Sequence, residues 1–475
     1  MVVGEIAEAV DLLVIGGGPG GYAAAIWAAQ RGREVVLVDR RPPEELGGVC
    51  LQEGCIPSKM LIDVAEQVTR SSSLLGAGFS GGIRFEPLGF QGHRQKVIAE
   101  LSRGVGNLLD SYGIQTRQGS LRFTRPGAAV LHTPDDQAQF LEFRDAIIAT
   151  GSRATELPPL PFDHTRILSS AEVLALDRLP SSLIVVGAGY IGVELGTAYA
   201  KLGTQVTIVE QRPEILPGFA PELVAPVRRR LRELGVRVGT STTATGQAGS
   251  RIELSGPDGP EVLETEIVLV CVGRCPNTDE LGLEAIGLIP LPDGRLPVAA
   301  DRRLAPHVAA IGDCTPGPAL AHKATAEAMV AVEALSGART SFDPTAIPEV
   351  VFTDPPIATT GLSSEEAGAL GHDVAVSRFP LKALGRAVSQ GATAGFAQLV
   401  IDAPSGVLLG AQLVGATAPE LIAEATLAIE MGATAEDLSL SIHPHPTASE
   451  QLAEAAHVGV GSPLHVASHA VGRLP

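Results

Sequence analysis

The sequence predicts an α/β protein in which one strand–turn–helix–strand unit occurs twice and a smaller α+β domain follows at the C-terminus. Three observations predict this class. The 475 residues suit about three domains at roughly 150 residues each. Two glycine-rich turns each lie between a short apolar strand pattern and a helical pattern. Strand patterns at 397–401 and 408–414, with a helical pattern at 419–431, predict the third domain.

The first unit begins with an apolar strand at 11–15, which leads into the glycine-rich turn 16–21. An alanine-rich helix at 22–30 and a strand at 34–38 follow. This order of elements is that of a Rossmann-like dinucleotide-binding domain.

Each polar or glycine position in this unit has a mechanical role. Gly16 permits the tight turn, Gly18 lets a pyrophosphate approach the backbone, and Gly21 lets the helix pack on the strand. The N–H groups at the helix N-terminus face the phosphates. Asp39, directly after the second strand, is placed to accept hydrogen bonds from an adenosine ribose.

A second unit repeats the pattern further along the chain. A strand at 183–186 leads into Gly187, Gly189 and Gly192, and the next helix and strand end at Glu210. The first glycine and the acidic residue are 23 positions apart in both units, since 39 − 16 equals 210 − 187. A single glycine-rich turn without a ligand is common, but two complete units of equal spacing indicate two bound dinucleotides.

The acidic residue of the second unit also indicates which nicotinamide dinucleotide binds. Glu210 suits the ribose hydroxyl groups of NAD and would repel the 2′-phosphate of NADP. Arg212 lies close in the sequence, so the residues favour NAD and leave NADP open.

A close pair of cysteines follows the first unit. The chain has five cysteines, too few for a disulfide scaffold of this length, which favours a catalytic pair. Residues i and i+5 of a regular helix have Cα atoms roughly 8–9 Å apart, beyond disulfide reach. We therefore expect Cys50 in a distorted turn and Cys55 near the start of a helix that Pro57 helps to open, where a thiol becomes more acidic. The alternative is two buried cysteines that act as small apolar residues.

Motifs along nearly the whole chain form one pattern. They are Gly-Gly-x-Cys-x4-Cys-Ile-Pro-Ser-Lys at 47–59, Ile-Ile-Ala-Thr-Gly-Ser at 147–152, Val-Gly-Arg-Cys-Pro-Asn-Thr at 272–278, Ala-Ile-Gly-Asp at 310–313, Leu-Ala-His-Lys-Ala at 320–324, Thr-Asp-Pro-Pro at 353–356 and His-Pro-His-Pro-Thr-Ala-Ser-Glu at 443–450. This set, with two dinucleotide units in this order, resembles the pyridine nucleotide–disulfide oxidoreductases.

The resemblance implies a role for each residue near the cysteines. It implies that the first unit holds FAD, with Asp313 on the ribityl chain of the flavin, and that the second unit holds NAD. Cys55 would be the flavin-proximal sulfur and Cys50 the sulfur that exchanges with substrate. Lys59 and Glu194 would form an ion pair beside the isoalloxazine. Glu194 also needs a partner on general grounds, because it lies in an otherwise apolar helix.

Two further glycines belong to the cofactor motifs. The resemblance assigns Gly151 and Gly273 to the cofactor-binding residues. No metal site is predicted, because no second cysteine knuckle or histidine cluster accompanies the five cysteines.

The C-terminal motif carries the proton chemistry. Attack of a dithiol on a disulfide needs a base, and an imidazole titrates in the useful range. A lone histidine in a loop is usually structural, but the resemblance assigns this role to His445, with Glu450 orienting the ring, whereas His443 keeps a structural interpretation. The resemblance implies that His445 reaches the cysteine pair of the other subunit, and therefore a homodimer.

Some residues depart from the commoner family pattern. Asp39 stands where a glutamate is more usual, and we expect its shorter side chain still to reach a ribose. Glu53 places a carboxylate between the two cysteines, which we expect to raise the thiolate pKa. The other cysteines, Cys271, Cys275 and Cys314, are expected to be buried small residues.

The predicted domains follow from the order of the motifs. Residues 1–150 and 274–345 would form the FAD-binding domain, 151–273 an inserted NAD-binding domain, and 346–475 an α+β dimerisation domain. The resemblance implies oxidation of a dihydrolipoyl dithiol on a lipoylated partner, such as a 2-oxo acid dehydrogenase acyltransferase or the glycine cleavage H protein. A family member acting on another disulfide, and a non-catalytic FAD- and NAD-binding redox sensor, remain alternatives.

Charge and hydropathy exclude other classes. The formal net charge of −18 repels nucleic acid and anionic membrane. The first ten residues lack a basic region and contain two glutamates, so we expect no secretory signal and a cytoplasmic protein. The nearly uncharged stretch 183–200 is explained by the second glycine-rich unit better than by a membrane span.

Overall fold

A computed structural model describes residues 7–73 and 80–467. The chain forms two compact units, each built from two separate stretches. The first unit comprises Met1–Leu179 and Leu269–Asp343, and the second comprises Pro180–Val268 and Pro344–Pro475. Residues 151–179 therefore lie with the first unit, although the predicted NAD-binding domain includes them. The predicted four-segment division stays a prediction.

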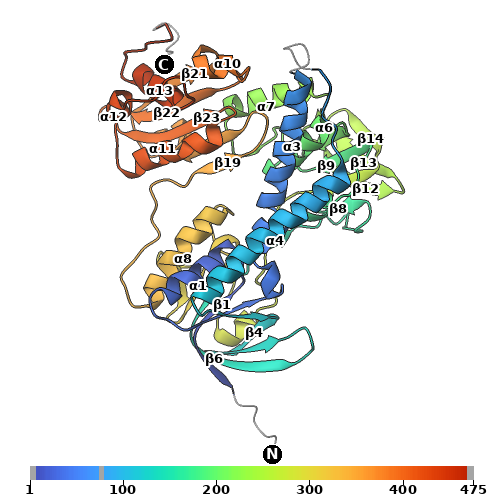
Figure 1. The fold of residues 1–475 in the computed structure, drawn as a ribbon, viewed down its shortest axis with the longest axis vertical. Helices are drawn as coiled ribbons and strands as arrows, with labels where there is room; N and C mark the ends of the chain where they lie inside the picture. Colours follow the sequence, from blue (N-terminus) through green and yellow to red (C-terminus); the bar gives the residue numbers. More distant parts are fainter. Residues whose placement is uncertain (1–6, 74–79, 468–475) are drawn as a thin grey trace, which may run out of the picture. The chain divides into compact units, whose positions relative to one another are not determined.

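The first unit is built on a mostly parallel sheet of Rossmann type (Figure 1). Its strand order is β17-β18-β6-β1-β2-β3, with β4 and β5 continuing beside β6. The strands are β1 (Glu8–Ile15), β2 (Val35–Asp39), β3 (Gln115–Gln118), β4 (Ser120–Arg125), β5 (Ala128–His132), β6 (Ala138–Ile148), β17 (Arg303–Ala305) and β18 (Val308–Ala310). The central strand β1 is buried along its second half, as its apolar pattern predicts.

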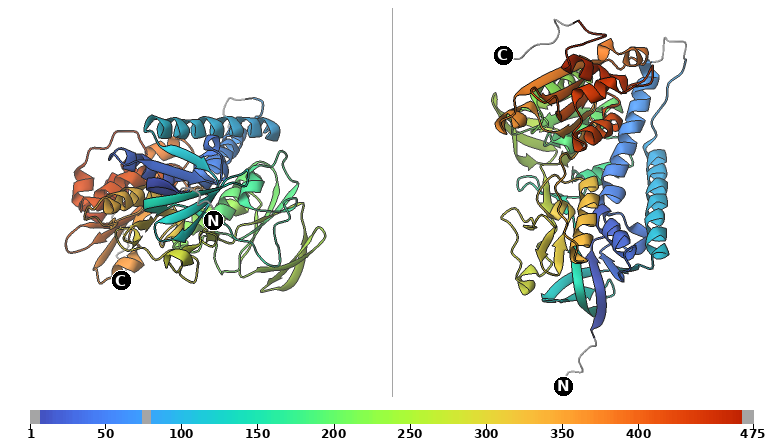
Figure 2. Two further views of the ribbon diagram at one scale, coloured as in Figure 1. Left: turned by 90° about the horizontal axis from the view of Figure 1, so that it is seen from below. Right: turned by 90° about the vertical axis from the view of Figure 1, so that its left-hand side faces the viewer.

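The helix that follows the glycine-rich turn packs against other helices of the first unit. The helices are α1 (Pro19–Ala29), α2 (Gly48–Glu53), α3 (Cys55–Ser73), α4 (Pro87–Ser111) and α8 (Ala321–Leu335). Helix α1 packs on α8 and on the long helix α4, which Figure 2 shows from a second direction. The first turn of α1 contains Pro19, which suits a helix start because its missing N–H would have no helical partner.

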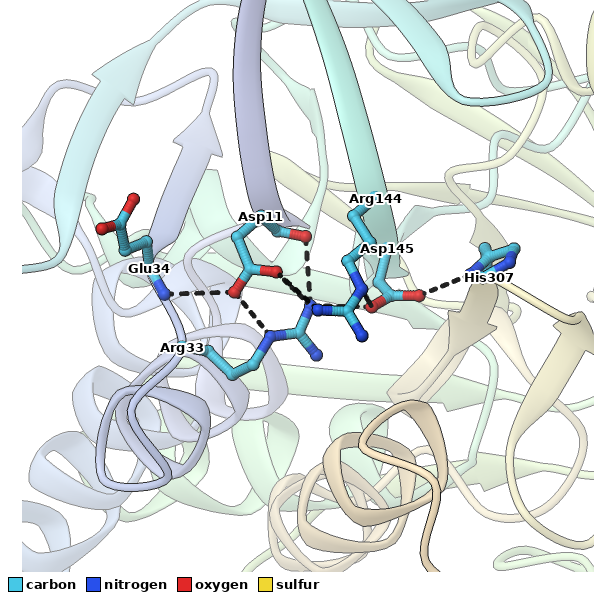
Figure 3. A network of polar contacts seen from close by, with 6 residues as sticks. All are labelled: Asp11, Arg33, Glu34, Arg144, Asp145 and His307. Carbon is cyan, nitrogen blue, oxygen red and sulfur yellow. Dashed lines mark hydrogen bonds and ion pairs between the residues drawn. The ribbon is translucent and has the colours of Figure 1, made fainter.

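A network of charged groups links the strands of this sheet (Figure 3). Arg33 donates to Asp11 on β1 at 2.6 Å and to Asp145 on β6 at 2.7 Å. Asp145 is 2% exposed and also contacts His307 Nδ1 at 2.9 Å. The hydrogen bond from Arg33 lowers the pKa of Asp11. The network pairs the buried carboxylate of Asp145 and joins four segments, namely β1, the loop before β2, β6 and the turn before β18.

The second unit contains the other glycine-rich turn on a parallel sheet. Strands β9 (Ser182–Val186), β10 (Gln205–Val209) and β11 (Arg237–Gly239) pair in parallel, with helices α6 (Tyr190–Lys201) and α7 (Pro221–Glu233). An antiparallel ribbon follows, formed by β12 (Thr243–Ala248), β13 (Arg251–Gly256) and β14 (Gly259–Glu264). The apolar stretch 183–200 thus forms β9, the turn and most of α6.

The C-terminal part of the second unit is an antiparallel sheet covered by helices. The strand order is β19-β20-β23-β22-β21. Its elements are β19 (Glu349–Val351), β20 (Ile357–Gly361), β21 (Val374–Pro380), β22 (Phe396–Asp402), β23 (Leu408–Val414), α11 (Ala418–Glu430), α12 (Ala435–Leu440) and α13 (Glu450–Gly459). The two strands and the helix predicted from the sequence correspond to β22, β23 and α11 within one residue at each end.

Across the described ranges, no helix combines the length and the apolar character that crossing a membrane requires. In the same residues, His, Cys, Asp and Glu side chains do not gather in threes around a point that would suit a metal ion.

Candidate active site

Two glycines of the first turn are required by the backbone and by packing. Gly16 has φ +106°, and a Cβ there would lie 2.3 Å from Ala149 O. A Cβ at Gly21 would lie 1.7 Å from Gly16 O. These positions confine the turn against β6 and let α1 start close to β1.

At the middle position of each turn, nothing in the protein itself requires a glycine. Gly18 has φ −74°, and the nearest protein atom to a Cβ there would be Gly48 Cα, 3.8 Å away. Gly189 has φ −69°, and a Cβ there would meet no atom within 4 Å. Neither backbone strain nor packing demands glycine, so the room beside each Cα fits a close-approaching phosphate group.

The helices that follow these turns have N-termini suited to anions. Gly18 and Gly189 are the N-caps of α1 and α6, and a glycine has no side chain that could cap the helix. The N–H groups of a first helical turn need partners from outside the helix, and phosphate oxygens supply them. Gly187 has φ +104°, and Gly192 is buried inside the first turn of α6. Both turns therefore fit a bound dinucleotide.

The acidic residue of each unit makes the same pair of backbone contacts. Asp39 accepts hydrogen bonds from Gly17 N–H and from Arg41 N–H, the latter at 2.8 Å. Glu210 accepts from Ala188 N–H at 2.7 Å and from Arg212 N–H at 2.9 Å. Each carboxylate thus fixes its glycine-rich turn and retains lone pairs for a ribose. Contact with a ribose stays a prediction at both residues.

The cysteine pair lies where two helices meet. Cys50 is in the short helix α2, Cys55 is the first residue of α3, and Gly54 between them breaks the helical path with φ −128° and ψ −107°. The expectation of a distorted turn at Cys50 is wrong, because the distortion falls on Gly54. The predicted helix start at Cys55 is confirmed. A Cβ at Gly54 would lie 2.9 Å from Val49 O, which explains the glycine.

The two thiols interact directly. A hydrogen bond to Cys55, followed by burial, raises the pKa of Cys50, whereas the charge of Lys59 acts in the opposite direction. The two thiols therefore act as one coupled pair, with Cys55 at the helix N-terminus and Cys50 half-buried. Lys59 lies on α3, one turn after Cys55, and acts electrostatically on the pair.

The expected influence of Glu53 on the thiols is not found. Glu53 Oε2 accepts a hydrogen bond from Arg41 NH2 at 2.8 Å, so the guanidinium neutralises the carboxylate. The raised pKa of Cys50 comes from Cys55 and from burial. The sequence contains no signal for this ion pair, because Arg41 lies in the loop after β2 whereas Glu53 is the last residue of α2.

The remaining cysteines differ from one another. Cys314 is fully buried as predicted, and burial raises its pKa to about 11. Cys271 and Cys275 are only partly buried, so the prediction of burial is wrong for them. Cys275 lies in the short strand β16 (Arg274–Pro276), in which Arg274 and Cys275 are partly buried and Pro276 is buried.

Asp313 lies in a polar cluster at the carboxyl end of the first sheet. It belongs to the 3₁₀ turn η3 (Gly312–Cys314), which follows β18, and its Oδ2 accepts from Ser152 Oγ at 2.5 Å. Arg274 donates from Nε to Ser152 Oγ at 2.7 Å. The sequence motifs contain Ser152 and Arg274, but their role in orienting Asp313 was not predicted. The two assigned glycines, Gly151 and Gly273, have φ +67° and +139° and allow the chain to turn beside this cluster.

Glu194 is held within the second unit. It is 3% exposed, and its Oε1 accepts from Phe352 N–H at 2.8 Å. The expectation that this carboxylate needs a partner is confirmed for the backbone contact. Lys59 belongs to the first unit, and its ion pair with Glu194 stays a prediction.

The histidine–glutamate pair has the geometry expected of a general base. His445 Nδ1 lies 2.8 Å from Glu450 Oε1, and the imidazole is 77% exposed. Burial alone would raise the pKa of Glu450, but hydrogen bonds from His445 and from Thr447 N–H lower it. The carboxylate thus stays ionised and orients the ring so that Nε2 faces outward. His443 lies 2.7 Å from Glu424 and is largely buried, in agreement with a structural role.

Comparisons with known proteins agree with this arrangement. The family model for pyridine nucleotide-disulphide oxidoreductases matches residues 10–328, and the model for the dimerisation domain of that family matches residues 347–456. The chain belongs to this family.

Relatives of known name cover the whole chain. Dihydrolipoyl dehydrogenase from Geobacillus stearothermophilus is 43% identical over 98% of this chain and 99% of its own length. The protein of the same name from Halobacterium salinarum is also 43% identical, over 98% and 99%. Members of the family with solved structures share the fold. LpdA from Mycobacterium tuberculosis matches with a TM-score of 0.87 and 28% identity, over 94% of this chain and 99% of its own. An HOCl-induced flavoprotein disulfide reductase from Escherichia coli matches with a TM-score of 0.82 and 25% identity, over 93% and 98%.

Proposed function

We propose that this chain is an NAD-dependent dihydrolipoyl dehydrogenase, which oxidises a protein-bound dihydrolipoyl dithiol through Cys50, Cys55 and FAD. The observation that carries the proposal is the thiol pair at the start of α3, in the same unit as the first dinucleotide turn. The named relatives over the full length of the chain support the choice of substrate. FAD, when bound to the first unit, supplies the two-electron carrier between the cysteine pair and NAD.

The cysteines act in sequence. A substrate thiolate attacks Cys50 Sγ of the Cys50–Cys55 disulfide, so a mixed disulfide forms and Cys55 leaves as a thiolate. The second substrate thiol then attacks the substrate sulfur of that mixed disulfide, which closes the cyclic lipoyl disulfide and releases the Cys50 thiol. Two electrons and two protons have then passed from the substrate to the protein. Cys55 suits the role of leaving group because its position at a helix N-terminus stabilises a thiolate.

His445 supplies the base. Its imidazole accepts the proton of the substrate thiol, and Glu450 holds the ring in one orientation and stabilises the imidazolium. The dimerisation-domain match supports a homodimer, in which His445 of one protomer serves the cysteine pair of the other.

The second unit would hold NAD, with Glu210 on the ribose and Glu194 beside the nicotinamide end. The substrate would arrive on a lipoylated protein, such as the acyltransferase of a 2-oxo acid dehydrogenase complex or the glycine cleavage H protein, in the cytoplasm. The chain departs from common family members at Asp39, and we infer that its carboxylate still reaches the ribose of FAD.

A substrate panel tests the activity. Purified protein is assayed for NAD reduction with dihydrolipoamide, glutathione and dithiothreitol, with Cys50→Ser as the matched inactive control. We expect kcat/KM for dihydrolipoamide to exceed that for the other thiols by at least about a hundredfold. Equal rates for all thiols would indicate another disulfide substrate, and no rate with any thiol in the flavin-loaded protein would favour a redox sensor.

Mixed dimers test the shared site. Cys50→Ser and His445→Ala variants are unfolded and refolded together in equal amounts. Random pairing makes half of the dimers mixed, and each mixed dimer has one intact site if cysteine and histidine come from different protomers, so activity should recover to about a quarter of wild type. If both residues act within one protomer, every site retains one lesion and activity stays at the level of the parent variants.

A further inference from the structure

One carboxylate of the first unit is buried completely and takes no part in the chemistry above. Glu327, on the face of α8 turned to the sheet, is 0% exposed. A charge in such a position needs partners on every lone pair, because burying an isolated carboxylate is very costly.

Both oxygens of Glu327 are occupied. Oε1 lies 2.8 Å from Lys323 Nζ and 2.9 Å from Arg302 NH1. Oε2 accepts a hydrogen bond from Gly312 N–H at 2.7 Å. Lys323 is 3% exposed, so the ion pair between these two residues is shielded from water.

Arg302 is held in an unusual conformation to reach this carboxylate. Its φ is +66°, in the left-handed region that residues with a Cβ rarely adopt. Its guanidinium also lies over the ring of Phe342, 4.9 Å from the centroid. A backbone cost at Arg302 is therefore offset by contacts made deep in the unit.

The third partner of Glu327 connects the cluster to the cofactor region. Gly312, with φ +77°, opens the 3₁₀ turn η3 and directly precedes Asp313. Ala324 lies one turn before Glu327 and packs closely on two glycines. A Cβ on Gly312 would lie 3.3 Å from Ala324 Cβ, and a Cβ on Gly20 would lie 3.2 Å from it. Helix α8 thus supports both η3 and the start of α1.

We propose that Glu327 is a positioning residue for FAD: its buried carboxylate, neutralised by Lys323 and Arg302, fixes Gly312 and thereby orients Asp313 toward the cofactor. The proposal rests on the proposed role of Asp313 at the flavin site. It assigns a binding role to a residue that touches no cofactor atom.

The number of acceptor oxygens makes the carboxylate specific for this task. A carboxylate has two acceptor oxygens, and Glu327 uses one for the cations and the other for Gly312. A glutamine has a single acceptor oxygen, which the two cations would attract. Glu327→Gln should therefore turn its NH2 group toward Gly312 N–H and release η3.

The test measures FAD release from the diluted holoprotein by the rise of flavin fluorescence. Four proteins are compared with wild type: Glu327→Gln, Asp313→Asn, the double variant, and Glu284→Gln. The last is the control, because Glu284 forms an exposed ion pair with Arg122 in the same unit. We expect each single variant at 327 and 313 to release FAD roughly tenfold faster, the loss of about one charge-assisted hydrogen bond. Glu284→Gln should behave as wild type.

The double variant separates positioning from general weakening. If Glu327 acts through Asp313, the double variant should release FAD about as fast as Asp313→Asn alone. If the double variant instead releases FAD roughly a hundredfold faster than wild type, the two effects multiply and the proposal is overturned. A wild-type release rate in Glu327→Gln beside fast release in Asp313→Asn would overturn the proposal while leaving the flavin role of Asp313 intact. Slow release in both variants would overturn that role as well.

A second variant covers a failure of Glu327→Gln to fold. Lys323→Met combined with Glu327→Gln removes the buried ammonium together with the carboxylate charge, so that only Arg302 competes for the amide oxygen. With the competing cation gone, this variant should release FAD more slowly than Asp313→Asn. Release as fast as that of Asp313→Asn with an intact fold would contradict the competition described above.

Discussion

The two dinucleotide turns have the same internal hydrogen bonds but different surroundings. In both units the N–H after the first glycine and the N–H two residues after the acid donate to the acidic side chain. The first turn is covered by the segment that leads to the cysteines: Gly47 N–H donates to Gly17 O at 2.9 Å, and a Cβ on Gly48 would lie 2.7 Å from Gly18 Cα. At the second turn, Leu216 N–H donates to Ala188 O at 2.8 Å in the same way, but a Cβ on Gly189 would meet no atom within 4 Å.

This difference matches two kinds of ligand. A prosthetic group that stays bound through many turnovers benefits from a turn closed by a second segment, because that segment must move before the ligand leaves. A co-substrate must enter and leave in each cycle, which an open turn allows. We infer that the redox cysteines are built on the segment that closes over FAD at Gly18, whereas the segment at Leu216 leaves Gly189 open.

The largest effects are expected at the cysteines of the covering segment. Cys50→Ser and Cys55→Ser should each lower kcat by at least about a thousandfold, because neither can form the disulfide. Their absorption spectra should differ: Cys50→Ser retains the thiol at the helix N-terminus and should show a long-wavelength thiolate–flavin band, which Cys55→Ser should lack. Identical spectra would show that the two sulfurs do not have the separate roles assigned here.

A smaller effect is expected at the acid of the open turn. Glu210→Arg should lower kcat/KM for NAD by roughly tenfold to a hundredfold and raise it for NADP, because the charge then suits a 2′-phosphate. The FAD content of the purified protein should not change. Asp258→Arg is the control, because Asp258 is exposed in the turn between β13 and β14 of the same unit, and it should leave the NAD preference intact. An unchanged preference in Glu210→Arg would place Glu210 away from the ribose.

The smallest effect concerns acid stability of the second unit. Asp354 lies 2.7 Å from both Lys201 Nζ and Arg230 Nε. Burial opposes its ionisation, but Lys201 and then Arg230 hold the pKa of Asp354 below its ordinary value. Since the folded pKa is lowered, this stabilisation is present above the unfolded pKa of about 4 and is lost as the pH falls through the folded value.

Asp354→Asn should therefore cost about 1–2 kcal/mol of unfolding free energy at pH 7 and progressively less below pH 4. Urea denaturation of wild type and variant at both pH values measures the difference. Asp373→Asn serves as the control for the loss of a carboxylate, because Asp373 is exposed and lies in the same unit. A penalty that stays constant from pH 7 to pH 3 would show that Asp354 does not stabilise the folded state through its charge.

The sequence predicted the repeated unit well because its signals are local. Short apolar runs, glycines at fixed spacing and a terminal acid are sufficient for β1, α1 and β2, and again for β9, α6 and β10. The observed bounds differ from the predicted ones by up to three residues, mainly at β1 and at the start of α1.

Contacts between distant segments could not be predicted in this way. The pair Arg41–Glu53 offsets the charge of Glu53, and nothing in the spacing signals it. Glu327 did leave a signal, since Lys323 and Glu327 are four residues apart in an alanine-rich helix, which is the spacing of a side-chain pair. Their burial, which makes them important, depends on how α8 packs against α1.

The comparison of the two turns is tested most directly by Gly18→Ala and Gly189→Ala. Both residues have ordinary φ values and room for a Cβ in the protein, so each variant should keep the thermal stability of the ligand-free protein. Gly18→Ala should release FAD roughly tenfold faster, and Gly189→Ala should raise KM for NAD roughly tenfold without loss of FAD. Gly16→Ala, with φ +106° and a Cβ 2.3 Å from Ala149 O, should instead lose folded protein. FAD loss caused by Gly189→Ala, or unchanged FAD release in Gly18→Ala, would contradict the assignment of the closed turn to FAD and the open turn to NAD.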